Sequence, residues 1–197
     1  MIITIAGQAG SGKSTVARIL AARLNLRHYS MGDMRRKMAE ARGMTLAQLN
    51  KVGETNDFTD REVDEFQARL GREEDDFVVD GRTSWYFVPH SLKVYLEADI
   101  SRRADRVFHD ERATERFASL EEAQQALEQR ESSDRARYRK YYGIDVHDRA
   151  HFDIVMDTST LAPEEVAARI VGTLRGGTGP AGRAGTSAGP RDAAGDA

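Results

Sequence analysis

The sequence feature that most constrains this chain is a glycine-rich stretch at residues 7–14, GQAGSGKS, which fits the pattern G-x-x-x-x-G-K-[ST]. A short apolar, β-branched run at residues 1–6 precedes it and predicts a buried strand. Residues 14–24 follow, with apolar side chains on one helical face. A glycine turn can match the pattern by chance, but a strand, a glycine loop and a helix in this order favour a P-loop that wraps around phosphate.

The residue types in this loop suit the phosphates of a nucleotide such as ATP. Glycines let successive backbone N–H groups point at phosphate oxygens, and the start of the helix adds free N–H groups and the positive end of its dipole. Lys13 places a cation on the β- and γ-phosphates, and the Ser14 hydroxyl can ligate Mg²⁺. The predicted ATP contacts are Gly7, Gln8, Ala9, Gly10, Ser11, Gly12, Lys13, Ser14 and Thr15.

Composition restricts the class of protein. The chain has 197 residues, enough for one α/β domain, and its net charge of −3 argues against general binding of nucleic acid. Cysteine is absent, which excludes disulfides, cysteine nucleophiles and thiolate metal sites. The sequence shows no apolar stretch long enough to span a bilayer and no secretion signal. We expect a cytoplasmic protein, by default a monomer, that binds neither nucleic acid nor membrane.

Strand and helix patterns alternate along the chain. Further strands are expected near residues 26–30, 77–80, 92–96 and 152–156. Helices are expected over residues 31–41, after Thr45, over 57–70 and 101–108, from the Ser119 cap to about 142, and from Pro163 to about 175. The many charges of the 57–70 helix are interpreted as a solvated face. The alternation predicts an α/β fold with a mainly parallel sheet flanked by helices, whose ligands lie beyond the strands' carboxyl ends.

Two further strand ends, which should meet the P-loop at one sheet edge, carry groups that suit a second phosphate. At residues 30–36 a small turn is followed by arginines at the start of a helix. At residues 80–82 a strand-end carboxylate can orient Mg²⁺-bound water, and an arginine can fork onto a phosphate. Both arginines would otherwise be surface ion pairs. The predicted substrate contacts are Ser30, Gly32, Asp33, Arg36, Asp80 and Arg82, and the predicted metal ligands are Ser14 and Asp80.

A third feature is the arginine-rich helical stretch at residues 130–140. Arginines recur on its successive turns, at the end of a long segment, and clustered guanidinium groups suit the clamping of a transferring phosphoryl group. A charged stretch of this kind is otherwise a solvated helix. We interpret it as a mobile helical lid, and the candidate catalytic residues are Lys13, Arg130, Arg135 and Arg137.

Together these motifs resemble the archaeal type of cytidylate kinase, a family of nucleoside monophosphate kinases with a P-loop. The resemblance covers about residues 1–175 and rests on the P-loop, the 30–36 and 80–82 motifs, the 130–145 stretch and residues 152–159. Its most specific part is RYRKYYGID at residues 137–145. It implies the P-loop kinase fold, ATP and Mg²⁺ at the loop, a nucleoside monophosphate in the opposite cleft, and a lid that closes over both.

The same resemblance assigns roles to individual residues. Lys13 and Ser14 would hold the donor phosphates and Mg²⁺, Arg36 and Arg82 the acceptor's phosphate, and the three arginines of the 130–140 stretch would come from the lid. The implied function is ATP-dependent phosphoryl transfer to CMP or dCMP, giving CDP or dCDP. The acceptor's phosphate is already an anionic nucleophile, so no general base is needed.

The acceptor stays open at this stage. After Arg82 the chain continues Thr83-Ser84-Trp85, whereas the family's pattern has a leucine directly after the arginine, near the acceptor pocket. A P-loop kinase for another nucleotide, for shikimate or for gluconate is one alternative, and a nucleotide-sensing module without turnover is another. A regulatory GTP-binding switch is disfavoured, because the one candidate for its guanine-reading segment, residues 50–53, lacks the required aspartate.

Residues 176–197 are rich in glycine, alanine and proline and contain nothing apolar larger than alanine. Such a segment cannot bury enough surface to offset its ordering entropy, so we interpret it as a disordered tail after a kinase domain of residues 1–175.

Deleting residues 176–197 is expected to leave the melting temperature and the turnover nearly unchanged, as measured by circular dichroism and a coupled kinase assay. A large loss of either property would show that the tail docks on the domain.

Overall fold

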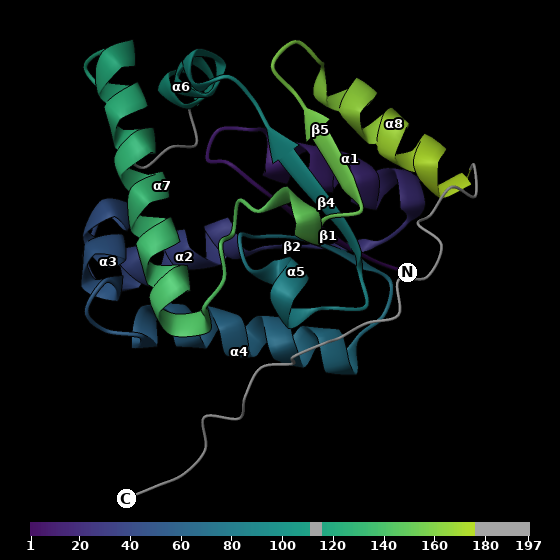
Figure 1. The fold of residues 1–197 in the computed structure, drawn as a ribbon, viewed down its shortest axis with the longest axis horizontal. Coiled ribbons are helices and arrows are strands. Elements are labelled where there is room, and N and C mark those ends of the chain that lie inside the picture. The colour runs from purple at the N-terminus through teal and green to yellow at the C-terminus, as the bar shows by residue number, and fades with distance from the viewer. Residues whose placement is uncertain (111–115, 176–197) are drawn as a thin grey trace, which may run out of the picture.

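The described part of the chain, residues 1–110 and 116–175 of a computed structural model, is built around a parallel β-sheet (Figure 1). Its strand order is β2-β3-β1-β4-β5, and each neighbouring pair runs parallel. The strands are β1 (Ile2–Gly7), β2 (Arg27–Ser30), β3 (Phe77–Asp80), β4 (Leu92–Glu97) and β5 (Ile154–Asp157). The predicted parallel sheet is therefore confirmed, and each strand lies within a residue or two of its expected place.

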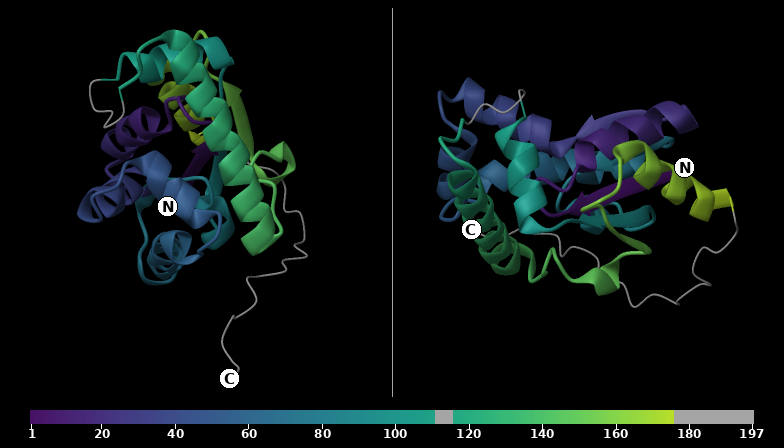
Figure 2. Two further views of the ribbon diagram at one scale, coloured as in Figure 1. Left: turned by 90° about the vertical axis from the view of Figure 1, so that its left-hand side faces the viewer. Right: turned by 90° about the horizontal axis from the view of Figure 1, so that it is seen from above.

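Helices cover both faces of the sheet. α1 and α8 pack on one face, and α2 to α5 pack on the other. α6 and α7 stand beyond the edge at which the strands end (Figure 2). The described helices are α1 (Lys13–Leu24), α2 (Met31–Ala41), α3 (Leu46–Gly53), α4 (Phe58–Glu73), α5 (Ser84–Phe87), α6 (Ile100–Phe108), α7 (Leu120–Tyr142) and α8 (Pro163–Arg175), with a 3₁₀ turn at Arg149–His151.

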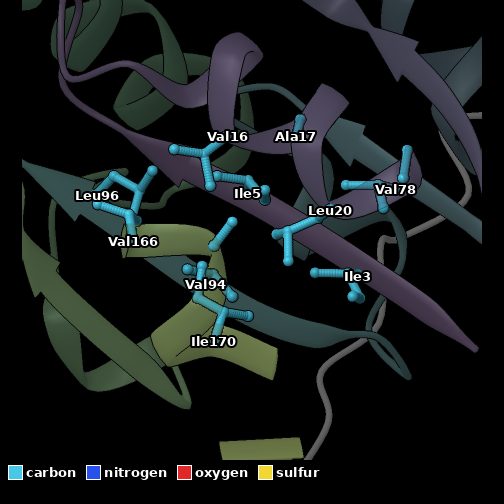
Figure 3. Close-up of a cluster of buried hydrophobic side chains, with 12 residues drawn as sticks. Ile3, Ile5, Val16, Ala17, Leu20, Val78, Val94, Leu96, Val166 and Ile170 are labelled. Atoms are coloured by element: carbon cyan, nitrogen blue, oxygen red, sulfur yellow. The ribbon is translucent and has the colours of Figure 1, made fainter. Parts of the chain in front are cut away.

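The central strand β1 is buried on both faces, so its side chains alternate between two cores. Ile3 and Ile5 point toward α1 and α8 and are fully buried (Figure 3). Ile2 packs in the cluster under α2 and α4 instead. A parallel strand covered on both faces requires the continuous apolar run with which the chain begins. The first core also contains Val16, Ala17, Leu20, Ala21, Val78, Val94, Leu96, Val166, Ala167 and Ile170.

Because the strands are parallel, their carboxyl ends lie at the same edge of the sheet. β1 runs directly into the P-loop, and the register sets Asp80 beside Ile5 on one side and beside Ser30 on the other. The P-loop, the 30–33 turn and Asp80 therefore meet at one edge, as the strand pattern predicts.

The long helix α7 crosses this edge, running from beside α6 at its start to the region of α3 and α4 at its end (Figure 1). Its first turn is capped as expected, since the Ser119 hydroxyl accepts a hydrogen bond from the backbone N–H of Glu122 at 3.1 Å. Gly143 ends it with a φ of 69°, a left-handed conformation that glycine adopts without strain. α7 thus links the two ends of the strand-end edge.

The interpretation of the α4 charges as a solvated face is wrong for two carboxylates. Asp60 and Asp64 are only 2% and 6% exposed. Asp60 accepts hydrogen bonds from Arg35 and Arg137, and Asp64 accepts one from the Tyr142 hydroxyl. Burial raises the pKa of Asp64 to about 7. A helical periodicity cannot show that another helix supplies partners for buried charges; the exposed charges are Arg61, Glu62, Glu65, Arg69, Arg72 and Glu73.

The sequence pattern did not predict the short helix α5, whose four residues are too few to establish a helical period. The predicted tail at residues 176–197 lies outside the described residues. None of the described helices combines the length and the apolar character that crossing a bilayer requires.

Leu20→Ala is expected to lower the free energy of unfolding by about 2–5 kcal/mol, because Leu20 is fully buried between the sheet and α8 and the alanine leaves a cavity. Urea denaturation measures the change. Leu120→Ala is the matched control, since Leu120 is 47% exposed and its truncation should change stability by less than about 0.5 kcal/mol. Equal losses from the two variants would contradict this description of the core.

Candidate active site

A cleft of about 580 Å³ opens at the carboxyl edge of the sheet. It is lined by parts of the P-loop, α2, the loop after β3, α6, α7 and the loop before α8. The cleft brings together most of the predicted site residues, namely Ala9, Gly10, Ser11, Gly12, Lys13, Ser14, Thr15, Gly32, Asp33, Arg36, Asp80, Arg82 and Arg130. The predicted residues that do not line it are Gly7, Gln8, Ser30, Arg135 and Arg137.

The path of the P-loop requires glycine at two positions where other elements come close. Gly7 has a φ of 138°, and a Cβ there would lie 1.9 Å from the carbonyl oxygen of Leu96 on β4. Gly10 has a φ of 79°, and a Cβ there would lie 2.8 Å from the carbonyl oxygen of Arg103 on α6. The glycines therefore allow the loop to curl while it packs tightly against its neighbours. The curl ends at Gly12, the residue before α1, where the helix presents its free N–H groups.

Two arginines of α6 hold the outer side of the P-loop through its carbonyl groups. Arg103 donates to the Ala9 carbonyl at 3.3 Å, and Arg106 donates to the Gly10 carbonyl at 3.4 Å and to the Thr158 carbonyl at 2.5 Å. These hydrogen bonds to the carbonyl groups restrain the backbone of the P-loop on the side that packs against α6. Sequence reasoning missed this role; the three-residue spacing of the arginines, close to one helical turn, is the signal that places them on one face.

Lys13 lines the cleft, and its pKa lies well below that of a free lysine. Its ammonium group donates to the Gln8 carbonyl at 2.5 Å. Burial and the guanidinium groups of Arg82 and Arg130 together lower its pKa to about 7, and the Asp80 carboxylate only partly opposes them. A cation held beside two other cations suits a site that receives a polyanion.

The strand-end carboxylate of Asp80 is a junction between elements. Its Oδ2 accepts hydrogen bonds from the Ser14 hydroxyl at 2.6 Å and from the Ser30 hydroxyl at 3.2 Å. Its Oδ1 lies 2.6 Å from Nε2 of His28 on β2. Asp80 therefore connects the head of α1 to the end of β2. His28 was missed because a single histidine in a short strand carries no sequence signal of its own.

The residues predicted to hold Mg²⁺ fit that ion chemically. Ser14 and Asp80 supply a hydroxyl and a carboxylate oxygen, the donors that Mg²⁺ prefers, and the two groups already face each other. Over residues 1–110 and 116–175, no group of three or more His, Cys, Asp or Glu side chains is placed to hold a metal ion. Two protein oxygens fit Mg²⁺ in its usual setting, in which substrate phosphates and water supply its other ligands.

The predicted acceptor contacts lie on two neighbouring segments. Ser30 caps α2, accepting a hydrogen bond from the backbone N–H of Asp33 at 3.3 Å, and Arg36 pairs with the Asp33 carboxylate one turn later. Arg82 follows β3 and is held by an ion pair between its Nε and the carboxylate of Asp134 on α7. Arg36 and Arg82 thus bring guanidinium groups to one cleft from α2 and from the β3 loop.

The three predicted lid arginines have different surroundings. Arg130 lines the cleft. Arg137 returns to the same face of α7, but about 10 Å further along the axis, where it is 1% exposed and paired with Asp60. Arg135 points elsewhere, is half exposed and lies 3.6 Å from Asp145. Of the three, the structure brings Arg130 to the phosphate-binding loop and leaves the other two outside the cleft lining.

Comparison with known proteins shows a consistent family signal. The model of the Cytidylate kinase-like family matches residues 2–160. The chain is 40% identical over 170 residues to the cytidylate kinase of Natronomonas pharaonis, covering 85% of this chain and 86% of that protein. It is 34% identical over 175 residues to the cytidylate kinase of Methanobrevibacter smithii, covering 89% and 99%.

Solved structures with the same fold include shikimate kinases. The enzyme from Aquifex aeolicus aligns with a TM-score of 0.56 at 21% identity, covering 89% of this chain and 97% of that one. The enzyme from Acinetobacter baumannii, in complex with shikimate, aligns with a TM-score of 0.59 at 17% identity, covering 90% and 94%. At these identities the likeness shows the fold alone, and it confirms the predicted P-loop kinase fold.

ATP binding at about pH 8 is expected to take up a proton, because the Lys13 amine is mostly neutral above its pKa of about 7 and bound phosphates favour the ammonium form. Affinity should therefore fall as the pH rises above 7. Calorimetry in buffers of different ionisation enthalpy measures the uptake. Lys13→Arg is the control, since a guanidinium stays charged and should bind without uptake. Wild-type binding without proton uptake would show that the free amine is already charged.

Proposed function

The chain belongs to the cytidylate kinase-like family, and on that premise we propose that it transfers the γ-phosphoryl group of ATP to CMP or dCMP, releasing CDP or dCDP and ADP. It is an enzyme of the nucleoside monophosphate kinase type. The observation that supports the proposal best is the single cleft, in which a P-loop shares the lining with Arg36 and Arg82 from two other elements. One cleft with two sets of phosphate-binding groups suits a reaction between two phosphates.

On the donor side, Lys13 and the P-loop N–H groups bind the phosphates of ATP and hold the γ-phosphoryl group in place. Ser14 and Asp80 would hold Mg²⁺, which when bound neutralises charge on the donor phosphates. Arg103 and Arg106 stiffen the loop from behind, so that its N–H groups need not reorganise during the reaction. The donor site therefore acts through position and charge.

On the acceptor side, Arg36 and Arg82 bind the phosphate of CMP, with Ser30, Gly32 and Asp33 shaping the turn beside it. An oxygen of that phosphate attacks the γ-phosphorus while the bond from this phosphorus to the β–γ bridging oxygen breaks, and ADP leaves. Arg130 stabilises the charge that spreads over the transferring group. Arg137 acts from outside the cleft, because it pairs α7 with α4. Arg135 would reach the phosphates only after the lid closes.

Three coarser features complete the proposal. All of the proposed ligands come from one chain, so a monomer is sufficient for activity. The lack of cysteine and the family's chemistry, which consumes ATP, fit a cytoplasmic enzyme. The kinase domain is residues 1–175.

ADP release measured with a panel of acceptors tests the proposal. We expect CMP and dCMP to give the highest kcat/KM, above UMP, AMP, shikimate and gluconate. Lys13→Ala should lower kcat at least ~10²-fold, because it removes a preorganised charge at the transferring phosphoryl group. Its circular dichroism spectrum and melting temperature should stay close to those of the wild type.

Two outcomes would contradict this function. ADP release that does not depend on any acceptor, or ATP binding without turnover, would favour a nucleotide-sensing module. Fastest turnover with a hydroxylated metabolite would favour one of the other P-loop kinases.

A further inference from the structure

A chain of alternating charges runs from the cleft into the interface between α7 and α4. Its members, each in ion-pair contact with the next, are Arg82, Asp134, Arg137, Asp60 and Arg35. The most exposed of them, Arg82, shows only 13% of its side chain. Buried ion pairs often contribute little net stability compared with apolar side chains of the same volume. A role other than stability is therefore best sought where this row of ion pairs reaches the cleft.

Arg82 is the member of the five that lines the cleft. Its Nε lies in ion-pair contact with Oδ2 of Asp134, and neither Nε nor the buried Nη2 has a hydrogen-bond partner among the described residues. An anion beside the Nε edge of a guanidinium attracts that edge, and the Nη groups remain to donate side by side to an oxyanion. Arg82 is therefore oriented by the protein and incompletely bonded without a ligand.

Asp134 is itself held from behind. Its Oδ1 accepts from Nη2 of Arg137, and Arg137 donates to both carboxylate oxygens of Asp60, at 2.9 and 2.8 Å. Burial alone would raise the pKa of Asp134, but Arg82, Arg137 and Arg130 outweigh burial and lower it, so the side chain is a carboxylate at neutral pH. Because Arg137 holds the Asp134 carboxylate in place, this carboxylate can fix the orientation of Arg82.

We propose that Asp134 is a positioning residue for the acceptor, because it holds Arg82 by Nε so that the Nη groups meet the acceptor's phosphate. The inference rests on the proposed function, since that phosphate is the one on the nucleoside monophosphate. Three guanidinium groups against two carboxylates leave one positive charge in excess, which the acceptor's phosphate neutralises. Asp134 lies on α7, and Arg137 pairs with both Asp134 and Asp60, so the anion beside Arg82 belongs to the packed interface between α7 and α4.

A double-mutant cycle tests this role. Asp134→Asn is expected to raise the KM for CMP about 10-fold, because it removes the buried negative charge beside Arg82, while the dissociation constant for ATP stays within about twofold. In an Arg82→Ala background, Asp134→Asn should change the KM for CMP by less than about twofold, because Asp134 acts through Arg82. A direct contact between Asp134 and CMP, or a structural role alone, predicts the same effect in both backgrounds and would overturn the inference.

Asp60→Asn is the matched control. It makes the same substitution in the same buried chain but removes no contact of Arg82. It should lower the melting temperature about as much as Asp134→Asn and change the KM for CMP much less. An equal rise in KM from both variants would mean that loosening α7 is enough, and that Asp134 has no specific effect on Arg82.

A measurement on the wild type covers the case in which Asp134→Asn does not fold. The Nε–H proton of Arg82 should exchange slowly with solvent, both without ligand and with CMP bound. Its ¹⁵N-coupled signal is assigned by the loss of that signal in Arg82→Ala. Rapid exchange in either state would overturn the inference. Failure of the proposed function would show earlier and differently, as a wild-type enzyme that does not phosphorylate CMP.

Discussion

The hydrogen bonds to Asp80 hold together the segments on which the cleft depends. Its carboxylate joins Ser14 at the start of α1 to Ser30 and His28 on β2, and so connects the P-loop to the turn at residues 30–33. These groups can meet because β1, β2 and β3 are parallel and in register, which brings their polar carboxyl ends to one edge. With any of these strands reversed, its end group would lie a full strand length away from the others.

The lining of the cleft carries more lysine and arginine than aspartate side chains, so positive charge is in excess there. Burial together with Arg82 and Arg130 lowers the pKa of Lys13 to about 7, which shows how unfavourable another cation is at this point without a ligand. In the proposed function, the substrate phosphates would relieve this repulsion, and the same cations would then supply affinity and charge stabilisation in the transition state.

The long helix α7 carries this electrostatic arrangement from the cleft to the body of the protein. Arg130 lines the cleft, while one turn further along Asp134 pairs with Arg82 and, through Arg137, is joined to Asp60 on α4. Charged side chains on a single helix therefore serve the site and the interface at once. This explains why an arginine-rich stretch that looks like a solvated surface contains one of the most deeply buried large side chains, Arg137.

Local chemistry along the chain determined the strand–loop–helix of the P-loop, the parallel alternation, the caps of α3 and α7, and the meeting of Ser14 with Asp80. Each of these depends on neighbouring residues or on the shared direction of parallel strands. The tertiary structure alone decided which of the many charges are buried. Asp60, Asp64 and Arg137 have the same helical spacing as exposed charges, and the packing of α4 against α7 and its other neighbours brings them partners from distant parts of the chain. The grip of Arg103 and Arg106 on the P-loop likewise joins residues about ninety positions apart, a separation at which sequence carries no pairing signal and only the folded chain brings opposite partners within hydrogen-bond distance.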